Sequence, residues 1–548
     1  MIADHLAELV RTALARANEG RTPAEEPEIR FERPKRREHG DWSTNVAMVA
    51  GEGNPRELAQ ELVDLMPESR FVERVELAGP GFINFYLSSA WLHNVIVRAA
   101  DPESGFGRTD EGKGTRVNVE YVSANPTGPI NVVSGRHAAF GDSISNLLEA
   151  TGHDVTREFY INDFGRQTRL FGASIAAHYL TLQGKDTSVP EDGYHGDYVE
   201  NIAEAVLTEH GDKYVDVPEE ERETGLARLG LELMLENMRS TLESFGTRFD
   251  VWSRESQLHE SGAVEWAISD LKQRGYIEER DGALWFLSSK FGDDKDRVII
   301  RSNGEPTYLA ADTAYLLNKF ERGFQHLTYV WGADHHGTVV RLKGVAQAMG
   351  FDPDQVEVLL VQIVTLKSGG ETLKASKRKG VLVPLADLLD EVGVDAARYM
   401  FLTRSIDAPL EFDIELAKEQ APENPVYYVQ YAHARISSIL RKAADEAIEV
   451  DVHAAQLRRL EHQSEDTLMR KLASYEEVIP QAASARTPQK LTRYVEELAS
   501  DFSSFYRDCK VITDDEELTR ARLALCVATR SVVADGLGLL GVGAPERM

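Results

Sequence analysis

The segment 116–163 constrains the fold of this chain more than any other part of the sequence. In RVNVEYVS, Val117, Val119 and Tyr121 alternate with polar residues, which is the pattern of a β-strand. GRHAAFGDSISNLLEATG then carries apolar residues at helical spacing and stops at Gly152, and DVTREFYIND has the pattern of a second strand. Strand, helix and strand in succession predict a βαβ unit, and hence a parallel sheet within an α/β domain.

The chain has 548 residues, more than one hydrophobic core can organise, so three or four domains are expected. Residues 1–100 have the mixed pattern of a small α+β domain, and the α/β pattern covers residues 113–383. Within the latter, a charged and mostly helical stretch around 182–273 is too long for a loop and is interpreted as an insertion. VEVLLVQIVTL, residues 356–366, is continuous and rich in β-branched residues, which indicates one buried strand. From 384 to 548 the pattern is helical, without strand alternation.

The composition is that of an ordinary globular protein and not of a disordered or membrane-spanning one. Hydrophobic residues make up 42% and charged residues 28% of the chain, and no apolar run approaches the roughly 18 residues of a membrane span. The first residues fit neither a secretory nor a transit signal, and Cys509 and Cys526 have neither metal nor redox spacing, so we expect a reduced, cytoplasmic protein with no membrane partner. The net charge of −29 argues against a general nucleic-acid coat, but not against a nucleic-acid partner held by basic residues gathered on one face.

The turn between the first strand and the helix, PTGPINVVSGR (residues 126–136), has the form of a phosphate-binding turn. Such a turn points backbone N–H groups and the positive end of the helix dipole at a ligand above the sheet edge. Thr127, Asn131 and Ser134 add neutral hydrogen-bond donors. The pattern G-x-G-x-x-G does not follow a strand, which sets a dehydrogenase aside. The alternative is that the turn binds nothing and that Ser134 is only a helix N-cap.

A basic stretch, ETLKASKRKG (residues 371–380), follows the predicted buried strand. In it, Lys374 and Lys377 flank Ser376. A basic loop with a glycine, placed above a nucleotide-type sheet, suits a triphosphate or a pyrophosphate leaving group. The alternative is a solvated basic loop.

Acidic and amide side chains gather where the predicted strands end. Glu120 alternates out of the strand away from the valines, and Asn125 follows in the turn. Tyr308 and Asp312 are four residues apart, so they share one face of a helix. A pocket with carboxylates at strand ends suits a cationic substrate, and a guanidinium would bind them in bidentate fashion. The alternative for each residue taken singly is a polar group satisfied within the fold.

GADHHG, residues 332–337, combines an aspartate with two histidines. Adjacent residues rarely provide three ligands to one ion, and no fourth candidate stands at a zinc spacing, so no metal site is expected. We expect Gly332, Asp334 and His335 to lie in a loop that contacts nucleotide or substrate, and the alternative is a packed turn.

Together these stretches resemble arginyl-tRNA synthetases of the bacterial type, along nearly the whole chain and in that family's order. The stretches that carry the resemblance are VEYVSANPTGP, EFYINDFGRQ, PTYLAADTAYL, YVWGADHHG, LKASKRKG, DLLDEVGVDAARYMFLTRS, NPVYYVQYAHARISSIL and the terminal GLLGVGAPERM. The resemblance implies a multidomain α/β fold of class I, with a Rossmann-like parallel-sheet catalytic domain, an α+β N-terminal domain and an all-α anticodon-binding domain.

The resemblance also implies a reaction and its partners. Arginine and ATP, the latter expected with Mg²⁺, give arginyl-adenylate and pyrophosphate, and the arginine then passes to the 3′ end of tRNA-Arg. The family implies a monomer whose N-terminal domain contacts the tRNA elbow and whose C-terminal domain binds the anticodon.

Matched position by position, the resemblance assigns site residues. Those implied to hold arginine are Glu120, Asn125, Tyr308 and Asp312, and those implied to bind ATP are Thr127, Gly128, Gly135, Gly332, Asp334 and His335. The implied tRNA contacts are Asn84, Tyr428, Tyr431, Arg435 and Met548. The implied catalytic residues are Asn131, Ser134, Lys374, Ser376 and Lys377. Phe502, Phe505 and Tyr506 lie in the anticodon region, and for most of them core packing is favoured.

One departure from the family pattern bears on catalysis. The family's first signature is close to His-Val-Gly-His, and the aligned residues here are NVVS, residues 131–134. In class I enzymes those imidazoles donate hydrogen bonds to the phosphates in the transition state, and an amide N–H and a hydroxyl are also donors. Because the second signature keeps both lysines and its serine, we expect an active arginine–tRNA ligase. The alternative is an impaired paralogue that binds tRNA or arginine without charging tRNA.

Overall fold

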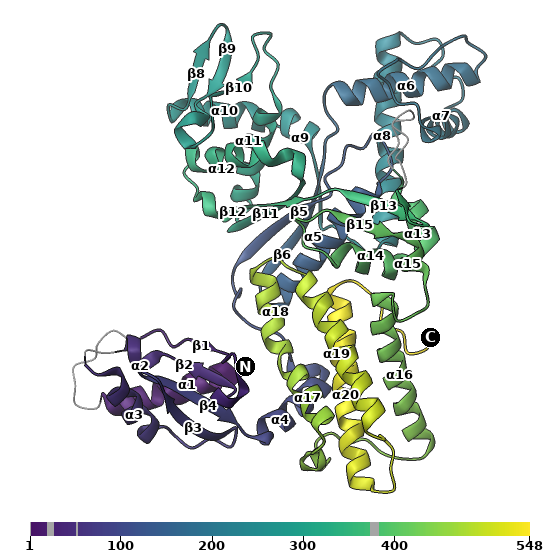
Figure 1. Ribbon diagram of the computed structural model, residues 1–548. Helices are drawn as coiled ribbons and strands as arrows, with labels where there is room; N and C mark the ends of the chain where they lie inside the picture. The colour runs from purple at the N-terminus through teal and green to yellow at the C-terminus, as the bar shows by residue number, and fades with distance from the viewer. Residues whose placement is uncertain (1, 19–26, 51–52, 373–382) are drawn as a thin grey trace.

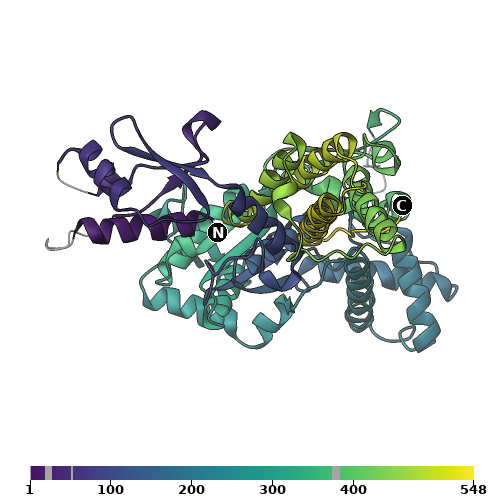
Figure 2. The same ribbon diagram turned by 90° about the horizontal axis from the view of Figure 1, so that it is seen from below.

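The computed structural model describes residues 2–18, 27–50, 53–372 and 383–548. Figure 1 shows an N-terminal unit, a central sheet with a lobe on either side, and a bundle of long helices that ends in the C-terminus. Viewed from below, the N-terminal unit and the lobe around α7 lie at opposite ends of the molecule (Figure 2). No helix within the described ranges is long and apolar enough to cross a bilayer.

The N-terminal unit is an antiparallel sheet covered by helices. Its strand order is β1-β2-β4-β3, and α1 buries Leu6, Val10 and Ala13 against it. Its elements are α1 (Ile2–Ala17), β1 (Phe31–Glu32), β2 (Trp42–Thr44), α2 (Val46–Val49), α3 (Pro55–Leu65), β3 (Val72–Ala78) and β4 (Phe82–Leu87). Helix α4 (Ser89–Ala100) connects this unit to the rest of the chain and packs on the C-terminal helices.

The central sheet is parallel throughout, in the order β12-β11-β5-β6-β7. Helix α5 connects β5 to β6 and helix α12 connects β11 to β12, so the predicted βαβ unit is confirmed. The bounds are β5 (Arg116–Tyr121), α5 (Val132–Ala150), β6 (Asp154–Ile161), β7 (Val251–Arg254), β11 (His326–Gly332), α12 (His336–Ala348) and β12 (Val356–Val361). The valines of β5 are fully buried, as strands covered on both faces require.

Two lobes flank this sheet (Figure 1). One is helical and comprises α6 (Arg166–Leu182), α7 (Asp197–His210) and α8 (Glu219–Ser244). The other packs helices on an antiparallel sheet and comprises α9 (Glu255–Glu260), α10 (Ala263–Gln273), β8 (Ile277–Arg280), β9 (Ala283–Phe286), β10 (Arg297–Ile300) and α11 (Tyr308–Glu321). The interior of this second lobe forms one hydrophobic core with β11, α12 and β12 of the central sheet.

A small sheet, β14-β13-β15, leads into the C-terminal helices. Its strands are β13 (Val364–Ser368), β14 (Glu371–Thr372) and β15 (Leu410–Asp413), and the short helices around it are α13 (Leu385–Val392), α14 (Val394–Leu402) and α15 (Ile414–Lys418). The bundle consists of α16 (Pro425–Asp445), α17 (Gln463–Ala473), α18 (Tyr475–Ser484), α19 (Gln489–Asp508) and α20 (Glu516–Leu539).

One expectation about elements is wrong, and two others need an addition. The run 356–366 is not one strand, because it divides into β12 and β13, which belong to different sheets. The stretch 182–273 is mostly helical, as predicted, but it also contains β7, which pairs in parallel with β6 of the central sheet. The chain after residue 384 still contains one strand, β15, which pairs in parallel with β13.

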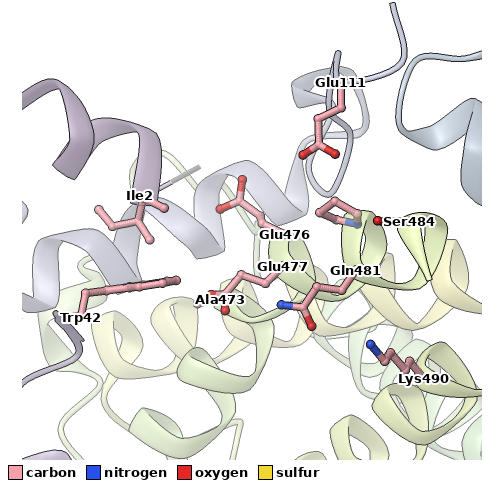
Figure 3. Close-up of a pocket in the computed structure, with 11 residues that line it drawn as sticks. Ile2, Trp42, Glu111, Ala473, Glu476, Glu477, Gln481, Ser484 and Lys490 are labelled. Atoms are coloured by element: carbon pink, nitrogen blue, oxygen red, sulfur yellow. The ribbon is translucent and has the colours of Figure 1, made fainter. Parts of the chain in front are cut away.

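Ion pairs join the N-terminal unit and α4 to the helical bundle. Arg470 lies 2.7 Å from Asp41, and Arg98 lies 2.8 Å from Glu476. Beside these pairs, a cavity of about 470 Å³ opens between the N-terminal unit and α18, with Trp42 on one wall (Figure 3). None of the residues predicted to bind substrate lines this cavity.

Candidate active site

The candidate site lies where the central sheet reverses its winding direction. From β5 the chain runs outward to β6 and β7, and from β11 it runs the opposite way to β12. The crevice between the carboxyl ends of β5 and β11 is therefore a topological switch point, where open parallel sheets bind ligands. The turn 126–135 follows β5, and a 3-10 helix, η4 (Ala333–His335), follows β11, so both loops with predicted ATP contacts meet here.

The backbone bends sharply directly after β5. Val122 and Ser123 have φ angles of 71° and 40°, in the left-handed region that a β-branched residue rarely adopts. The Ser123 hydroxyl donates to Glu120 Oε1 at 3.0 Å and accepts from the backbone N–H of Tyr160 at 3.2 Å. Strain of this kind is found preferentially at functional sites. The bend fixes the carboxylate of Glu120 at the end of the strand.

Asn131, not Ser134, caps helix α5. The Asn131 backbone is extended, and its Oδ1 accepts from the backbone N–H of Ser134 at 3.0 Å. The alternative in which Ser134 caps the helix is therefore wrong, because Ser134 already lies in the first turn. Since the cap uses the amide oxygen of Asn131, its NH₂ group remains as a donor at the positive end of the helix dipole.

The turn is tied to the residues that follow the basic stretch. Val132 N–H donates to the Val383 carbonyl at 3.1 Å, and Leu385 N–H donates to the Ile130 carbonyl at 2.8 Å. A Cβ on Gly135 would lie 2.6 Å from Leu385 Cδ1, so the glycine lets α5 and α13 pack closely. The predicted catalytic residues Lys374, Ser376 and Lys377 lie outside the described residues. The described chain resumes at Val383, beside the turn 126–135.

Thr127 and Gly128 connect the turn to the helical lobe. Thr127 is buried, and its carbonyl accepts from the Tyr198 hydroxyl of α7 at 2.8 Å. A Cβ on Gly128 would lie 3.4 Å from the same hydroxyl. The lobe thus supports the start of the turn from one side.

Glu120 is buried and is already paired with a cation. Its Oε2 lies 2.6 Å from Nζ of Lys319, a fully buried residue of α11. The rings of Tyr315 and Tyr329 lie 4.4 and 4.1 Å from the same ammonium group. The carboxylate charge is therefore balanced within the fold, a pairing that the sequence did not predict.

Two further carboxylates near Glu120 have no such partner. Burial, together with the charge of Glu120, raises the pKa of Asp312 on α11 to about 7. Burial and the carboxylates of Asp312 and Asp163 raise the pKa of Glu255, at the start of α9, to about 7. No lysine or arginine among the described residues forms an ion pair with Asp312 or Glu255. Carboxylates kept near their ionisation point in a crevice form a site suited to a cation.

Tyr308 and Asn125, the other two residues predicted to hold arginine, are exposed. Tyr308 is the first residue of α11 and is 67% exposed, one turn before Asp312. Asn125 is exposed, and its Nδ2 donates to Gln167 Oε1 of α6 at 2.6 Å. The structure brings Glu120 and Asp312 together and leaves these two residues outside the buried cluster.

The loop after β11 presents its polar residues to solvent. Asp334 and His335 are exposed, with Oδ1 and Nε2 3.9 Å apart. A Cβ on Gly332 would lie 2.6 Å from Asp334 Oδ1, so the glycine leaves room for that carboxylate. Nowhere in the described ranges do three His, Cys, Asp or Glu side chains come close enough to hold a metal ion.

A cleft of about 500 Å³ on the bundle gathers three of the predicted tRNA contacts. We call it the α16 cleft, and its aromatic and basic lining residues, with the C-terminal methionine, are Tyr431, Arg435, Arg441, Lys442, Tyr506, Arg547 and Met548. The guanidinium of Arg435 lies 4.6 Å from the Tyr431 ring and 5.1 Å from the Tyr506 ring. The Tyr428 hydroxyl instead contacts Ser503 at 3.4 Å. Exposed aromatic rings beside positive charge are what single-stranded RNA requires.

Asn84 lies within the N-terminal sheet. It is buried in β4, and its Oδ1 accepts from the Ser43 hydroxyl of β2 at 2.7 Å. The side chain therefore links β4 to β2, and no observation places it against tRNA, so its contact with tRNA stays a prediction. Phe502 and Phe505 are buried in the core, as favoured, whereas Tyr506 is 40% exposed.

Comparisons with known proteins match the three parts of the chain in order. The family model "Arginyl tRNA synthetase N terminal domain" matches residues 4–87, "tRNA synthetases class I (R), catalytic domain" matches 103–408 and "DALR anticodon binding domain" matches 429–548. The arginine–tRNA ligase of Moorella thermoacetica is 49% identical over 527 residues, 95% of this chain and 94% of that protein. The chain belongs to the arginyl-tRNA synthetase family.

Further comparisons agree with this membership. The arginine–tRNA ligase of Desulfitobacterium hafniense (strain DCB-2) is 45% identical, over 99% of this chain and 98% of that protein. The solved arginyl-tRNA synthetase of Thermus thermophilus, at 24% identity, has the same fold over the whole of both chains, with a TM-score of 0.75. The expected family and fold class are confirmed: this is a class I, ATP-dependent ligase with an α/β catalytic domain, an α+β N-terminal part and a helical C-terminal part.

Proposed function

We propose that the chain charges tRNA-Arg in two steps at the crevice between β5 and β11. In the first step, the carboxylate of arginine attacks the α-phosphorus of ATP, which forms arginyl-adenylate and releases pyrophosphate. In the second step, a terminal hydroxyl of tRNA attacks the activated carbonyl and AMP leaves. The observation that carries this proposal is the position of a carboxylate cluster and a phosphate-binding turn at one switch point.

Arginine is held through its guanidinium by the carboxylates of Asp312 and Glu255. Among the described residues, neither group forms an ion pair with a lysine or arginine, and a guanidinium supplies a permanent charge with paired N–H donors. Glu120, held by Lys319 and Ser123, shapes the pocket beside them. Asn125 and Tyr308 complete the rim around the substrate.

ATP lies along the turn and the start of α5. The Asn131 NH₂ group and the Ser134 hydroxyl donate to its phosphates as the α-phosphorus becomes five-coordinate. The remaining contacts in this proposal are Thr127, Gly128, Gly135, Gly332, Asp334 and His335, with Lys374, Ser376 and Lys377 meeting the leaving pyrophosphate. Mg²⁺ comes with ATP, held by phosphate oxygens and water, which is its usual coordination in such sites.

Neutral donors in place of imidazoles lower the rate without abolishing it. Losing one hydrogen bond to a charged group costs about 1.5–3 kcal/mol, or roughly 10- to 150-fold in rate. Replacing one donor with a poorer one costs less than deletion, because a bond is still made. The altered turn is therefore compatible with an active enzyme.

The proposed macromolecular partner is tRNA-Arg, bound with its anticodon at the α16 cleft. This cleft supplies four basic side chains in a chain of net charge −29. The proposal includes a monomer that acts in the cytoplasm, where tRNA is charged.

The experiment is aminoacylation of tRNA-Arg with labelled arginine and ATP. We expect arginyl-tRNA to accumulate, and lysine to be rejected because its ammonium lacks the planar fork of a guanidinium. A reaction without ATP is the control for non-enzymatic labelling. Binding of tRNA without any charging would contradict the proposal.

A further inference from the structure

The row of polar side chains on α5 continues beyond the signature turn. Asn131, Ser134 and His137 are three residues apart, so they follow one another along one side of the helix. His137 is 8% exposed, which makes it one of the buried polar side chains of the chain. None of the roles described above uses it.

One ring nitrogen of His137, Nε2, lacks a hydrogen-bond partner among the described residues. This nitrogen is buried. Buried polar side chains nearly always have a partner, so this nitrogen needs an explanation. The neighbouring Arg136 has an evident structural role, since its guanidinium donates to the carbonyls of Gln362, Ser405 and Ala408 at 2.8–3.0 Å.

Charged residues of both α5 and the loop after β11 act on the pKa of His137. Burial and the Arg136 guanidinium lower the pKa of His137 to about 4, with a smaller opposing effect of Asp334 and a further lowering by His335. Asp334 and His335 belong to η4, so residues of both elements that flank the crevice, α5 and η4, influence the pKa of the ring. At neutral pH the imidazole is uncharged and carries one N–H donor.

We propose that His137 is a nucleotide-binding residue, and that its Nε2–H donates a hydrogen bond to an oxygen of ATP in the crevice. This inference rests on the proposed function, because it requires ATP along α5. With Asn131 and Ser134, the histidine forms a row of neutral donors near the place of the two imidazoles of the family signature. A half-turn of the ring about its Cβ–Cγ bond exchanges Nε2 with Cε1, so a nitrogen can face either side without a change in volume.

The direct test is NMR of the full chain labelled with ¹⁵N-histidine, with and without a non-hydrolysable ATP analogue. The spectrum of His137→Gln assigns the His137 signals by their loss. We expect the His137 Nε2 resonance to shift when the analogue binds, whereas that of His433, whose Nδ1 contacts the Pro545 carbonyl in the bundle, stays in place. An unchanged His137 signal while calorimetry shows the analogue bound would overturn the inference and leave the proposed function standing. If the analogue does not bind at all, the proposed function fails and this inference with it.

Kinetics give a second, independent measurement. In ATP–pyrophosphate exchange with tRNA present, His137→Ala should raise the KM for ATP about 2- to 12-fold and leave the KM for arginine unchanged, as loss of one neutral hydrogen bond implies. His137→Gln, which keeps an N–H donor at similar reach, should recover most of the affinity. His153→Ala is the matched control, because that part-buried histidine bonds to the Leu148 carbonyl at the far end of α5. A folded His137→Ala variant with the native KM for ATP would overturn the inference.

Discussion

At the residue scale, the carboxylates of the site differ in whether a buried lysine pairs with them. Glu120 has Lys319 at 2.6 Å, whereas Asp312 and Glu255 repel each other and hold protons up to about neutral pH. A guanidinium is permanently charged, so it can replace those protons and relieve the repulsion. This is the physical basis that we propose for the choice of arginine.

Replacing Asp312 with asparagine removes the carboxylate that we propose binds the guanidinium of arginine through two hydrogen bonds. We expect Asp312→Asn to raise the KM for arginine in the charging reaction roughly 10- to 150-fold, the cost of a lost hydrogen bond to a charged group, with the KM for ATP unchanged. Asp354→Asn, at an exposed position after β11 and α12, is the matched control. An unchanged KM for arginine would remove Asp312 from the pocket.

The raised pKa values also fix the direction of a pH dependence. Asp312 and Glu255 are partly protonated until the pH passes about 7, and only their ionised forms bind a guanidinium. Arginine affinity should therefore increase between about pH 6 and pH 8, with release of protons on binding. Calorimetry in buffers of different ionisation enthalpy measures both the affinity for arginine and the number of protons released. The affinity of Asp312→Asn for arginine should change less with pH.

Asn131 has two roles that a pair of substitutions separates. Its Oδ1 caps α5, and its NH₂ group is the proposed phosphate donor. Asn131→Asp keeps a capping oxygen but replaces the donor with a negative charge, so we expect native stability in urea and a large loss of adenylation. Asn131→Ala should lose the cap as well and be less stable by about 1 kcal/mol. Native adenylation by the aspartate variant would show that this side chain does not contact phosphate.

At the element scale, the sequence predicted elements with strong periodicity and missed those defined by their partners. The βαβ unit was predictable because β5 alternates and α5 holds a helical pattern over five turns. The break between β12 and β13 was not, because Val361 and Val364 belong to one apolar run and only the partner strands distinguish them. β7 and β15 have four residues each, too few for a period, and are defined by pairing with β6 and β13.

The same contrast holds within the site. The turn and the carboxylates of Glu120 and Asp312 were visible in the sequence, whereas Glu255 follows a short strand and has no pattern of its own. The sequence did contain a sign that Lys319 lies near the carboxylates, because it stands seven residues after Asp312 and so on the same face of α11. The cap at Asn131 depends on where α5 begins, which is the least predictable feature of a helix.

Close packing of α5 on α13 holds the turn 126–135 beside Val383. We expect Gly135→Ala to destabilise the protein by about 1–3 kcal/mol, because its methyl group would clash with Leu385. Gly135→Ala combined with Leu385→Ala should recover part of the loss that each substitution alone causes, measured as the coupling free energy in urea unfolding. Additive losses would mean that the glycine is needed for another reason.

At the scale of the whole molecule, a strongly acidic protein gathers positive charge on one surface of its bundle. The chain carries 90 acidic and 61 basic residues, and yet four basic side chains line the α16 cleft. Counterion release makes such a surface sensitive to salt. Recognition of tRNA by this protein should therefore depend on local rather than net charge.

Arg435 lines this cleft, and its guanidinium lies close to the rings of both Tyr431 and Tyr506. We expect Arg435→Ala to weaken tRNA binding and to reduce the slope of log K against log salt by about 1 if the guanidinium contacts phosphate. Arg493→Ala is the control, because this exposed arginine of α19 pairs with Glu497 outside the cleft. Filter binding over a range of salt concentrations measures both variants. Equal effects of the two substitutions would contradict the assignment of the cleft.

The most direct measurement is charging of tRNA-Arg by the native chain and by the Asn131→His/Ser134→His variant, side by side. Our account predicts that the native chain produces arginyl-tRNA, and that the two histidines change the rate without being required for it. The account would be contradicted if the native chain did not charge tRNA-Arg and the histidine variant did. The amide and hydroxyl donors of the turn would then be insufficient for catalysis.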